Sequence, residues 1–107
     1  MVSLVERGEL DRCFGFERAG AAALELAGLS IQEVDRLELY SCFPVAVRTQ
    51  IRELGVPADA PVTLCGGMAY AGGPLNSFAF QGMVRMAHLL RAHPTAVSYT
   101  HLTLPTN

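Results

Sequence analysis

The segment from Cys65 to Ser77 constrains this chain more than any other, because four glycines and a proline separate a short apolar run from a long amphipathic segment. Glycine has no Cβ, so it can adopt positive φ and it allows a ligand to approach the main chain. A helix that follows such a loop presents unpaired N–H groups toward it. Two interpretations are open: a loop that binds a ligand with its backbone, and a tight turn that packs a strand against a helix.

The length of 107 residues, with 50% hydrophobic and 17% charged residues, fits one small domain with its own core. A net charge of −2 gives no reason to expect nucleic-acid binding, which needs clustered positive charge. All eight basic residues are arginines, so the chain lacks the lysine that a Walker phosphate loop or Schiff-base chemistry requires.

The three cysteines, Cys13, Cys42 and Cys65, are widely spaced and odd in number, which does not suggest a disulfide framework. The amino end shows no secretory signal and no long apolar span. We therefore expect a cytoplasmic protein that does not associate with membranes.

The last residues differ in composition from the rest of the chain. Residues 97–107 are rich in threonine and carry no Asp, Glu, Lys or Arg. They resemble the translated read-through of a transposon adapter used in sequencing libraries, so we expect the native domain to cover residues 1–96. The alternative is a short edge strand, because tyrosine and threonine favour the pleated conformation.

Helical and extended patterns alternate through the first half of the chain. Residues 17–27 are rich in alanine and leucine, which predicts a helix that stops at Gly28. Ser30 and Glu33 have the spacing of a capping box, which predicts a helical turn. Residues 36–40 then read as a strand.

The second half continues the alternation. Pro44 predicts the first turn of a helix that ends at Gly55, with Arg48, Arg52 and Glu53 on its solvent side. Residues 62–65 read as a second strand, and residues 75–91 as a long helix. One face of that helix, which we expect to fill the core, carries Phe78, Ala79, Gly82, Met83, Met86, Ala87 and Leu90. This order predicts an α/β fold of layered helices on a short mixed sheet, with any site on the loops that follow the strands.

Two loops lie at equivalent positions, each after a predicted strand and before a helix. The first lies within Leu-Glu-Leu-Tyr-Ser-Cys-Phe-Pro, residues 37–44, and the second is Gly-Gly-Met-Ala-Tyr-Ala-Gly-Gly-Pro-Leu-Asn-Ser, residues 66–77. Both resemble the carboxyl-terminal domain of the thiolase superfamily, in particular the bacterial acetyl-CoA acetyltransferase-like proteins related to the sterol-carrier-protein thiolases. The resemblance spans about residues 6–96 and implies part of one half of a thiolase fold.

The resemblance implies roles for two residues of the first loop. Thiolases carry Asn-Glu-Ala-Phe there, or His-Asp-Cys-Phe in the sterol-carrier-protein branch, and the first residue of the motif helps to stabilise the thioester oxyanion. Tyr40 takes that position, and its phenol can donate one hydrogen bond. Cys42 matches the cysteine of the second motif and is implied as an acid/base group. The alternative for Cys42 is a small buried hydrophobe.

In the second loop the resemblance implies that a thioester lies beside the backbone of Gly66, Gly67, Gly72, Gly73 and Pro74. Thiolases read Gly-His-Pro here, and their histidine activates the nucleophilic cysteine. Gly73 stands where that histidine would be, and glycine can neither accept nor donate a proton through a side chain. The resemblance implies that the nucleophilic cysteine, in the other half of the fold, and the last strand with its Cys-x-Gly motif both lie outside this chain, so we expect the chain alone to be inactive.

Three functions remain in view. The first is a fragment of a thiolase-like acyltransferase of lipid metabolism, which acts on acyl-CoA through an acyl-cysteine intermediate and works with an amino-terminal thiolase half and as a homo-oligomer. The second is a non-catalytic or altered acyl-CoA-binding protein that works with a partner subunit. The third is a nucleotide-binding module, which the glycine spacing disfavours. Coenzyme A would be a substrate, no cofactor is implied, and we expect no metal site because no Cys-x-x-Cys or His-x-x-x-His pair exists.

Overall fold

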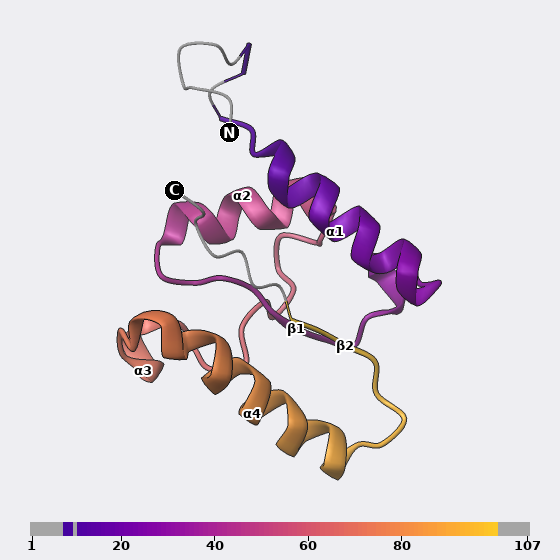
Figure 1. The fold of residues 1–107 in the computed structure, drawn as a ribbon, viewed down its shortest axis with the longest axis vertical. Coiled ribbons are helices and arrows are strands. Elements are labelled where there is room, and N and C mark those ends of the chain that lie inside the picture. The colour runs from indigo at the N-terminus through magenta and orange to yellow at the C-terminus, as the bar shows by residue number, and fades with distance from the viewer. Residues whose placement is uncertain (1–7, 10, 101–107) are drawn as a thin grey trace.

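A computed structural model describes residues 8–9 and 11–100 of the chain. The elements, in chain order, are α1 (Phe14–Ala27), the 3-10 turn η2 (Ile31–Glu33), β1 (Arg36–Glu38), α2 (Pro44–Leu54), α3 (Met68–Ala71), the 3-10 turn η3 (Leu75–Ser77), α4 (Phe78–Ala92) and β2 (Ser98–Thr100). Figure 1 shows the two strands between α1 and α2 on one side and α4 on the other, which confirms the α/β class.

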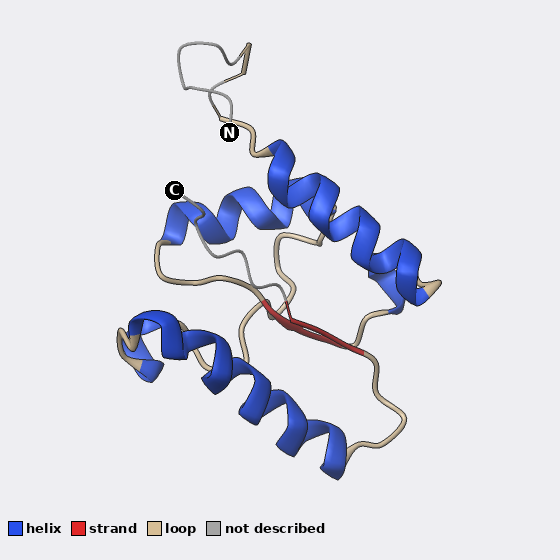
Figure 2. Ribbon diagram, in the orientation of Figure 1, coloured by secondary structure: helices blue, strands red, loops and turns tan. Residues whose placement is uncertain are grey.

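The sheet consists of β1 and β2, which run parallel (Figure 2). Arg36 is opposite Ser98 and Glu38 is opposite Thr100. Residues 98–100 therefore form a strand, as the edge-strand alternative for the end of the chain predicted. Residues 101–107 lie outside the part of the chain that the structure describes. The boundary at residue 96 and the adapter origin of the sequence beyond it stay predictions.

Local signals placed several element ends correctly. Gly28 and Gly55 both end their helices in the left-handed conformation, with φ of 67° and 68°. The capping box of Ser30 and Glu33 forms around η2, and Pro44 begins α2. α1 begins three residues earlier than predicted, at Phe14.

The strand predicted over residues 62–65 was wrong. Within the described residues this segment joins the sheet region through one main-chain hydrogen bond, from the N–H of Leu39 to the carbonyl of Val62 at 2.9 Å. The N–H groups of Leu64 and Cys65 bond instead to a side chain, the carboxylate of Glu38. The segment is extended because a buried carboxylate holds it, and not because a neighbouring strand does.

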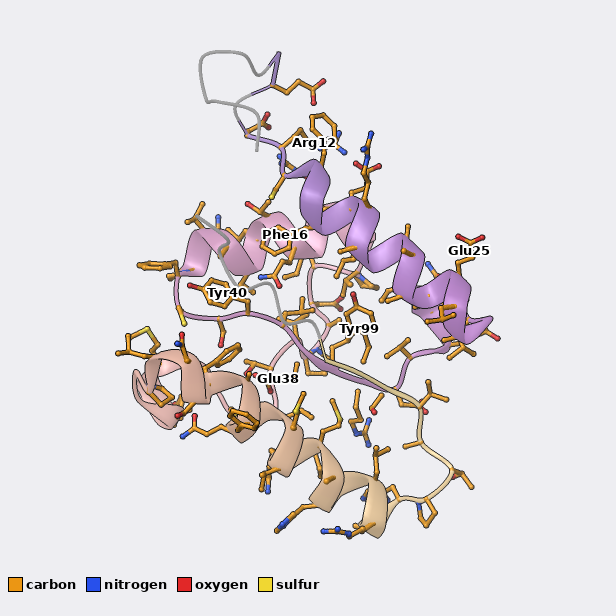
Figure 3. The ribbon with its side chains drawn as sticks, viewed as in Figure 1. Arg12, Phe16, Glu25, Glu38, Tyr40 and Tyr99 are labelled. Atoms are coloured by element: carbon orange, nitrogen blue, oxygen red, sulfur yellow. The ribbon has the colours of Figure 1, made fainter. Side chains whose placement is uncertain are left out.

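The core lies between the sheet and the α1–α2 layer. Its buried centre is Leu37, Leu39, Leu54 and Val56, and the half-buried residues packed against it include Ile31, Val34, Ile51, Ala60, Val62 and Tyr99. Successive strand residues point to opposite faces, so Leu37 and Leu39 face this core while Glu38 faces α4 (Figure 3). Burial of these side chains is the main driving force that packs the sheet against the α1–α2 layer.

Two side chains differ from the sequence-based expectation. Glu53, predicted on the solvent side of α2, has a fully buried carboxylate that pairs with Arg12 and Arg52 and accepts the N–H of Cys13. Met83, predicted in the core, is 48% exposed, whereas Met86 is buried as expected. None of the helices in the described part of the chain is long and apolar enough to span a membrane.

Candidate functional site

The first loop begins at Tyr40, whose backbone and ring are each held by a residue from another part of the chain. Gln50 of α2, which is fully buried, accepts a hydrogen bond from the Tyr40 N–H at 3.1 Å and donates one to the Tyr40 carbonyl at 2.7 Å. The ring of Tyr40 meets that of Phe78 edge to face, with centroids 5.7 Å apart. The tyrosine is therefore fixed between α2 and the start of α4 (Figure 3).

The phenol of Tyr40 interacts with the thiol of Cys42. Burial raises the pKa of Tyr40, and the hydrogen bond and charge interaction with Cys42 raise it further. The phenol thus stays protonated near neutral pH and remains a hydrogen-bond donor. Cys42 is half-buried rather than part of the core.

The buried carboxylate of Glu38 connects the first loop to the second. It accepts hydrogen bonds from the hydroxyl of Thr63 at 3.1 Å and from the N–H groups of Leu64 and Cys65 at 2.5 and 3.0 Å. The Thr63 hydroxyl in turn accepts the N–H of Gly66 at 3.1 Å. A side chain at the end of β1 thereby orients the first residues of the glycine loop.

Glycine is required at two positions of the second loop. Gly67, with φ of 68° and ψ of −167°, and Gly72, with φ of 74° and ψ of −171°, flank the single turn of α3 in a region of backbone space that is almost closed to other residues. A Cβ at Gly67 would lie 3.7 Å from Ser41, so this glycine also marks where the two loops approach each other. The sequence did not predict α3 itself.

Gly73 and Pro74 lead from this turn into η3 and α4. Gly73 has no positive φ, and a Cβ there would lie 3.0 Å from the terminal methyl carbon of Met68. Pro74 precedes the first residue of η3. The next residue, Leu75, has a φ of 49°, which is rare for a residue other than glycine and marks local strain.

The structure brings the two loops of candidate residues together. Ser41 lies against Gly67, and the Tyr40 ring lies against Phe78, the first residue of α4. An open groove of about 630 Å³ runs beside them, lined by Leu64, Cys65, Ala71, Ser77, Phe80, Gln81, Val84 and Arg85. Neither Tyr40 nor Cys42 lines this groove, so it adjoins the candidate residues without containing them.

Cys65 lines the groove but is a poor nucleophile. Burial raises the pKa of its thiol, and the charge of Glu38 and a hydrogen bond to it raise it further, against a smaller opposite effect of Arg85. The thiol therefore stays protonated. Within the described residues no group of three His, Cys, Asp or Glu side chains could hold a metal ion.

Sequence reasoning missed Glu38 and Gln50, the two fully buried polar residues that hold the loops. For Glu38 a signal existed: a charged residue between Leu37 and Leu39 in a short strand faces away from the core and needs partners. For Gln50 there was none, because glutamine is an ordinary residue in the middle of a helix.

Comparison with known proteins gives a consistent result. Two Escherichia coli proteins, the 3-oxoadipyl-CoA/3-oxo-5,6-dehydrosuberyl-CoA thiolase of strain K12 and a beta-ketoadipyl-CoA thiolase, are each 38% identical over 79 residues, which is 71% of this chain. The fold matches a monomeric SCP2-thiolase-like protein type 1 from Mycobacterium smegmatis with a TM-score of 0.80 and 30% identity over 90% of this chain. No family model matches the chain.

The chain thus shares sequence and fold with a portion of thiolases, which confirms its resemblance to the thiolase superfamily. It spans about a fifth of the length of these relatives, namely 20% of each Escherichia coli protein and 22% of the Mycobacterium smegmatis structure.

Proposed function

We propose that this chain is part of the carboxyl-terminal half of a thiolase-like acyltransferase and supplies two loops of its active site. The enzyme would act on acyl-CoA thioesters through an acyl-cysteine intermediate whose nucleophile lies outside this chain. The observation that carries the proposal is the approach of the first loop to the second, at Ser41 and Gly67, and to the start of α4, at Tyr40 and Phe78, in a chain similar to named thiolases.

Tyr40 and Cys42 are the proposed catalytic residues. Tyr40 donates a hydrogen bond to the thioester oxygen as negative charge develops there, and its raised pKa supports this role because the phenol keeps its proton. Cys42, half-buried beside that phenol, is the proposed acid/base group. Gly66, Gly67, Gly72, Gly73 and Pro74 are the proposed backbone contacts of the thioester.

The second candidate is an acyl-CoA-binding protein without thiolase catalysis. Gly73 favours it, because this position offers no side chain that can take a proton from a nucleophile. In that case the loops would bind the thioester and a partner subunit would supply any chemistry.

The proposed partner is the rest of a thiolase-like polypeptide. The outer side of α4 exposes Phe80, Met83 and Val84, which are 69%, 48% and 58% exposed, although a helix that is apolar on more than one side is typical of a buried layer. The relatives, of which the match covers about a fifth, contain enough further chain to cover it. Self-association of the complete protein and a cytoplasmic location, which three free cysteines suit, belong to the same proposal.

A labelled acyl group separates the two candidates. The protein that contains this chain is incubated with acyl-CoA labelled in the acyl group, quenched in acid and analysed for label on cysteine. If the protein is an enzyme, we expect a covalent adduct and thiolytic turnover. If it is a binding protein, we expect saturable acyl-CoA binding without an adduct. Preference for ATP or NAD over acyl-CoA would overturn both.

Cys42→Ala tests the acid/base role within the enzyme candidate. Turnover should fall by about 10²- to 10⁴-fold, the usual contribution of general acid–base catalysis. Cys13→Ala is the matched control, because this thiol precedes α1 and does not lie on either loop. Full turnover of Cys42→Ala would remove Cys42 from the mechanism.

A further inference from the structure

The side chain of Gln50 is polar and uncharged, and it is fully buried. Its carboxamide oxygen accepts the Tyr40 N–H at 3.1 Å, and its Nε2 donates to the Tyr40 carbonyl at 2.7 Å. The same Nε2 donates to the carbonyl of Ala46, one turn earlier in α2, at 2.9 Å. Both amide hydrogens are thus used, and two of the three bonds go to one residue.

These two bonds imitate those of a neighbouring β-strand. β1 pairs with β2 as far as Glu38, and the N–H of Leu39 bonds to the carbonyl of Val62, so Tyr40 is the next residue along the chain whose peptide groups need partners. A carboxamide carries the same donor and acceptor as a peptide group. Because an unpaired buried polar group costs free energy, the amide of Gln50 and the peptide groups of Tyr40 stabilise each other in this one arrangement.

We propose that Gln50 is a positioning residue, which fixes the backbone of Tyr40 so that the phenol lies against Phe78 and beside Cys42. The importance of this arrangement for activity rests on the proposed function, whereas the arrangement itself does not. The ring contact supports it: an edge-to-face pair at 5.7 Å and 89° requires a defined direction of the Tyr40 side chain, and that direction starts from the backbone that Gln50 holds.

The test compares Gln50→Met with Thr49→Ala in the protein that contains this chain. Methionine keeps the length and apolar volume of the side chain but removes both bonds to Tyr40. Thr49 is the matched control, because its hydroxyl donates to the Val45 carbonyl at 2.9 Å and so makes the same kind of one-turn bond within α2. Tyrosine labelled with ¹³C at Cζ is followed by NMR through a pH titration, and the Tyr40 signal is identified by its loss in Tyr40→Phe.

We expect Gln50→Met to move the titration of Tyr40 to lower pH and to weaken the ring contact with Phe78, since the phenol leaves its half-buried position beside Cys42. Thr49→Ala should leave the titration of Tyr40 and its ring contact with Phe78 unchanged. An unchanged Tyr40 titration in a folded Gln50→Met protein would overturn the proposal. So would an equal shift in Thr49→Ala, because the effect would then come from α2 as a whole.

Hydrogen exchange of the unsubstituted protein provides a test that does not depend on a variant's folding. The Tyr40 amide should be protected, and Gln50→Met, where folded, should accelerate its exchange about tenfold, as expected for loss of one buried hydrogen bond. Exchange of the Tyr40 amide at the rate of an unstructured chain would overturn the proposal. None of these readouts needs acyl transfer, so a failure of the proposed function is distinguishable from a failure of this inference.

Discussion

The main-chain N–H of Cys65 lies 3.0 Å from the carboxylate of Glu38, which is fully buried. This contact joins the end of β1 to the start of the glycine loop across 27 residues of chain. The position of the second loop therefore depends on the side chain of Glu38, the last residue of β1.

Glu38→Gln tests that dependence. The amide oxygen can still accept the two main-chain N–H groups that Oε2 accepts, but it carries no negative charge, and the NH₂ group faces the Thr63 hydroxyl in place of an acceptor oxygen. We therefore expect a loss of about 1–3 kcal/mol in the free energy of unfolding. Urea denaturation measures it. Glu25→Gln, an exposed position on α1, is the control and should change stability by less than about 0.5 kcal/mol. Equal stabilities of the two variants would contradict the structural role of Glu38.

Acid should weaken the contact between α1 and α2 through Glu53. Burial alone would raise the pKa of this carboxyl, but hydrogen bonds from the Cys13 N–H, Arg52 and Arg12 outweigh burial and lower it. A carboxyl whose pKa is lower in the folded state adds stability that is fully present above its unfolded pKa of about 4.3. That stability is lost as the pH falls through the folded-state pKa.

The melting temperature between pH 7 and pH 3 reports this effect. Glu53→Gln should be less stable than the unsubstituted protein at pH 7, with the difference shrinking toward pH 3. Arg12, whose Nε lies 2.9 and 2.8 Å from the two carboxylate oxygens, provides a second variant, Arg12→Met, with the same expected trend. A difference that is independent of pH would exclude Glu53 as the source.

Two glycines of α1 should respond in opposite directions to the same substitution. A Cβ at Gly20 would collide with the Cδ2 atom of Leu54, whereas nothing lies within 4 Å of a Cβ at Gly15. Gly20→Ala should destabilise the protein by about 1–3 kcal/mol through overpacking. Gly15→Ala should stabilise it by about 0.5–1 kcal/mol through helix propensity. Calorimetry that gave both variants the same sign would contradict the packing of α1 on α2.

The sequence predicted those parts of the fold that depend on adjacent residues. The stops at Gly28 and Gly55 and the capping box of Ser30 and Glu33 each follow from conformations that a few neighbouring residues determine. Residues 62–65 were assigned wrongly because their apolar pattern suits a strand, while the partner that actually holds them lies in β1.

The candidate site was predictable only in part for the same reason. The loop residues Tyr40 and Cys42 stand out by resemblance to thiolase motifs. The buried residues Glu38, Gln50 and Glu53 do not stand out in the sequence. Their roles depend on partners 10 to 41 residues away, which lie beside them only in the folded chain.

Gly72 and Gly73 are adjacent in the glycine loop, yet they should differ in their tolerance of histidine. Gly72 has a φ of 74° and a ψ of −171°, a conformation that costs other residues about 1–3 kcal/mol, so Gly72→His should lower stability by that amount. Gly73 has no positive φ, and its nearest obstacle is the flexible end of Met68, so Gly73→His should fold with a smaller loss of stability.

If the proposed function is correct, the new imidazole of Gly73→His supplies the missing proton acceptor, and acyl transfer by the protein that contains this chain should rise above that of Gly73→Ala. Thermal unfolding and thiolysis of acyl-CoA measure the two effects separately. Equal destabilisation at both glycines would refute the backbone argument, and a well-folded Gly73→His protein with no gain over Gly73→Ala would favour the acyl-CoA-binding alternative.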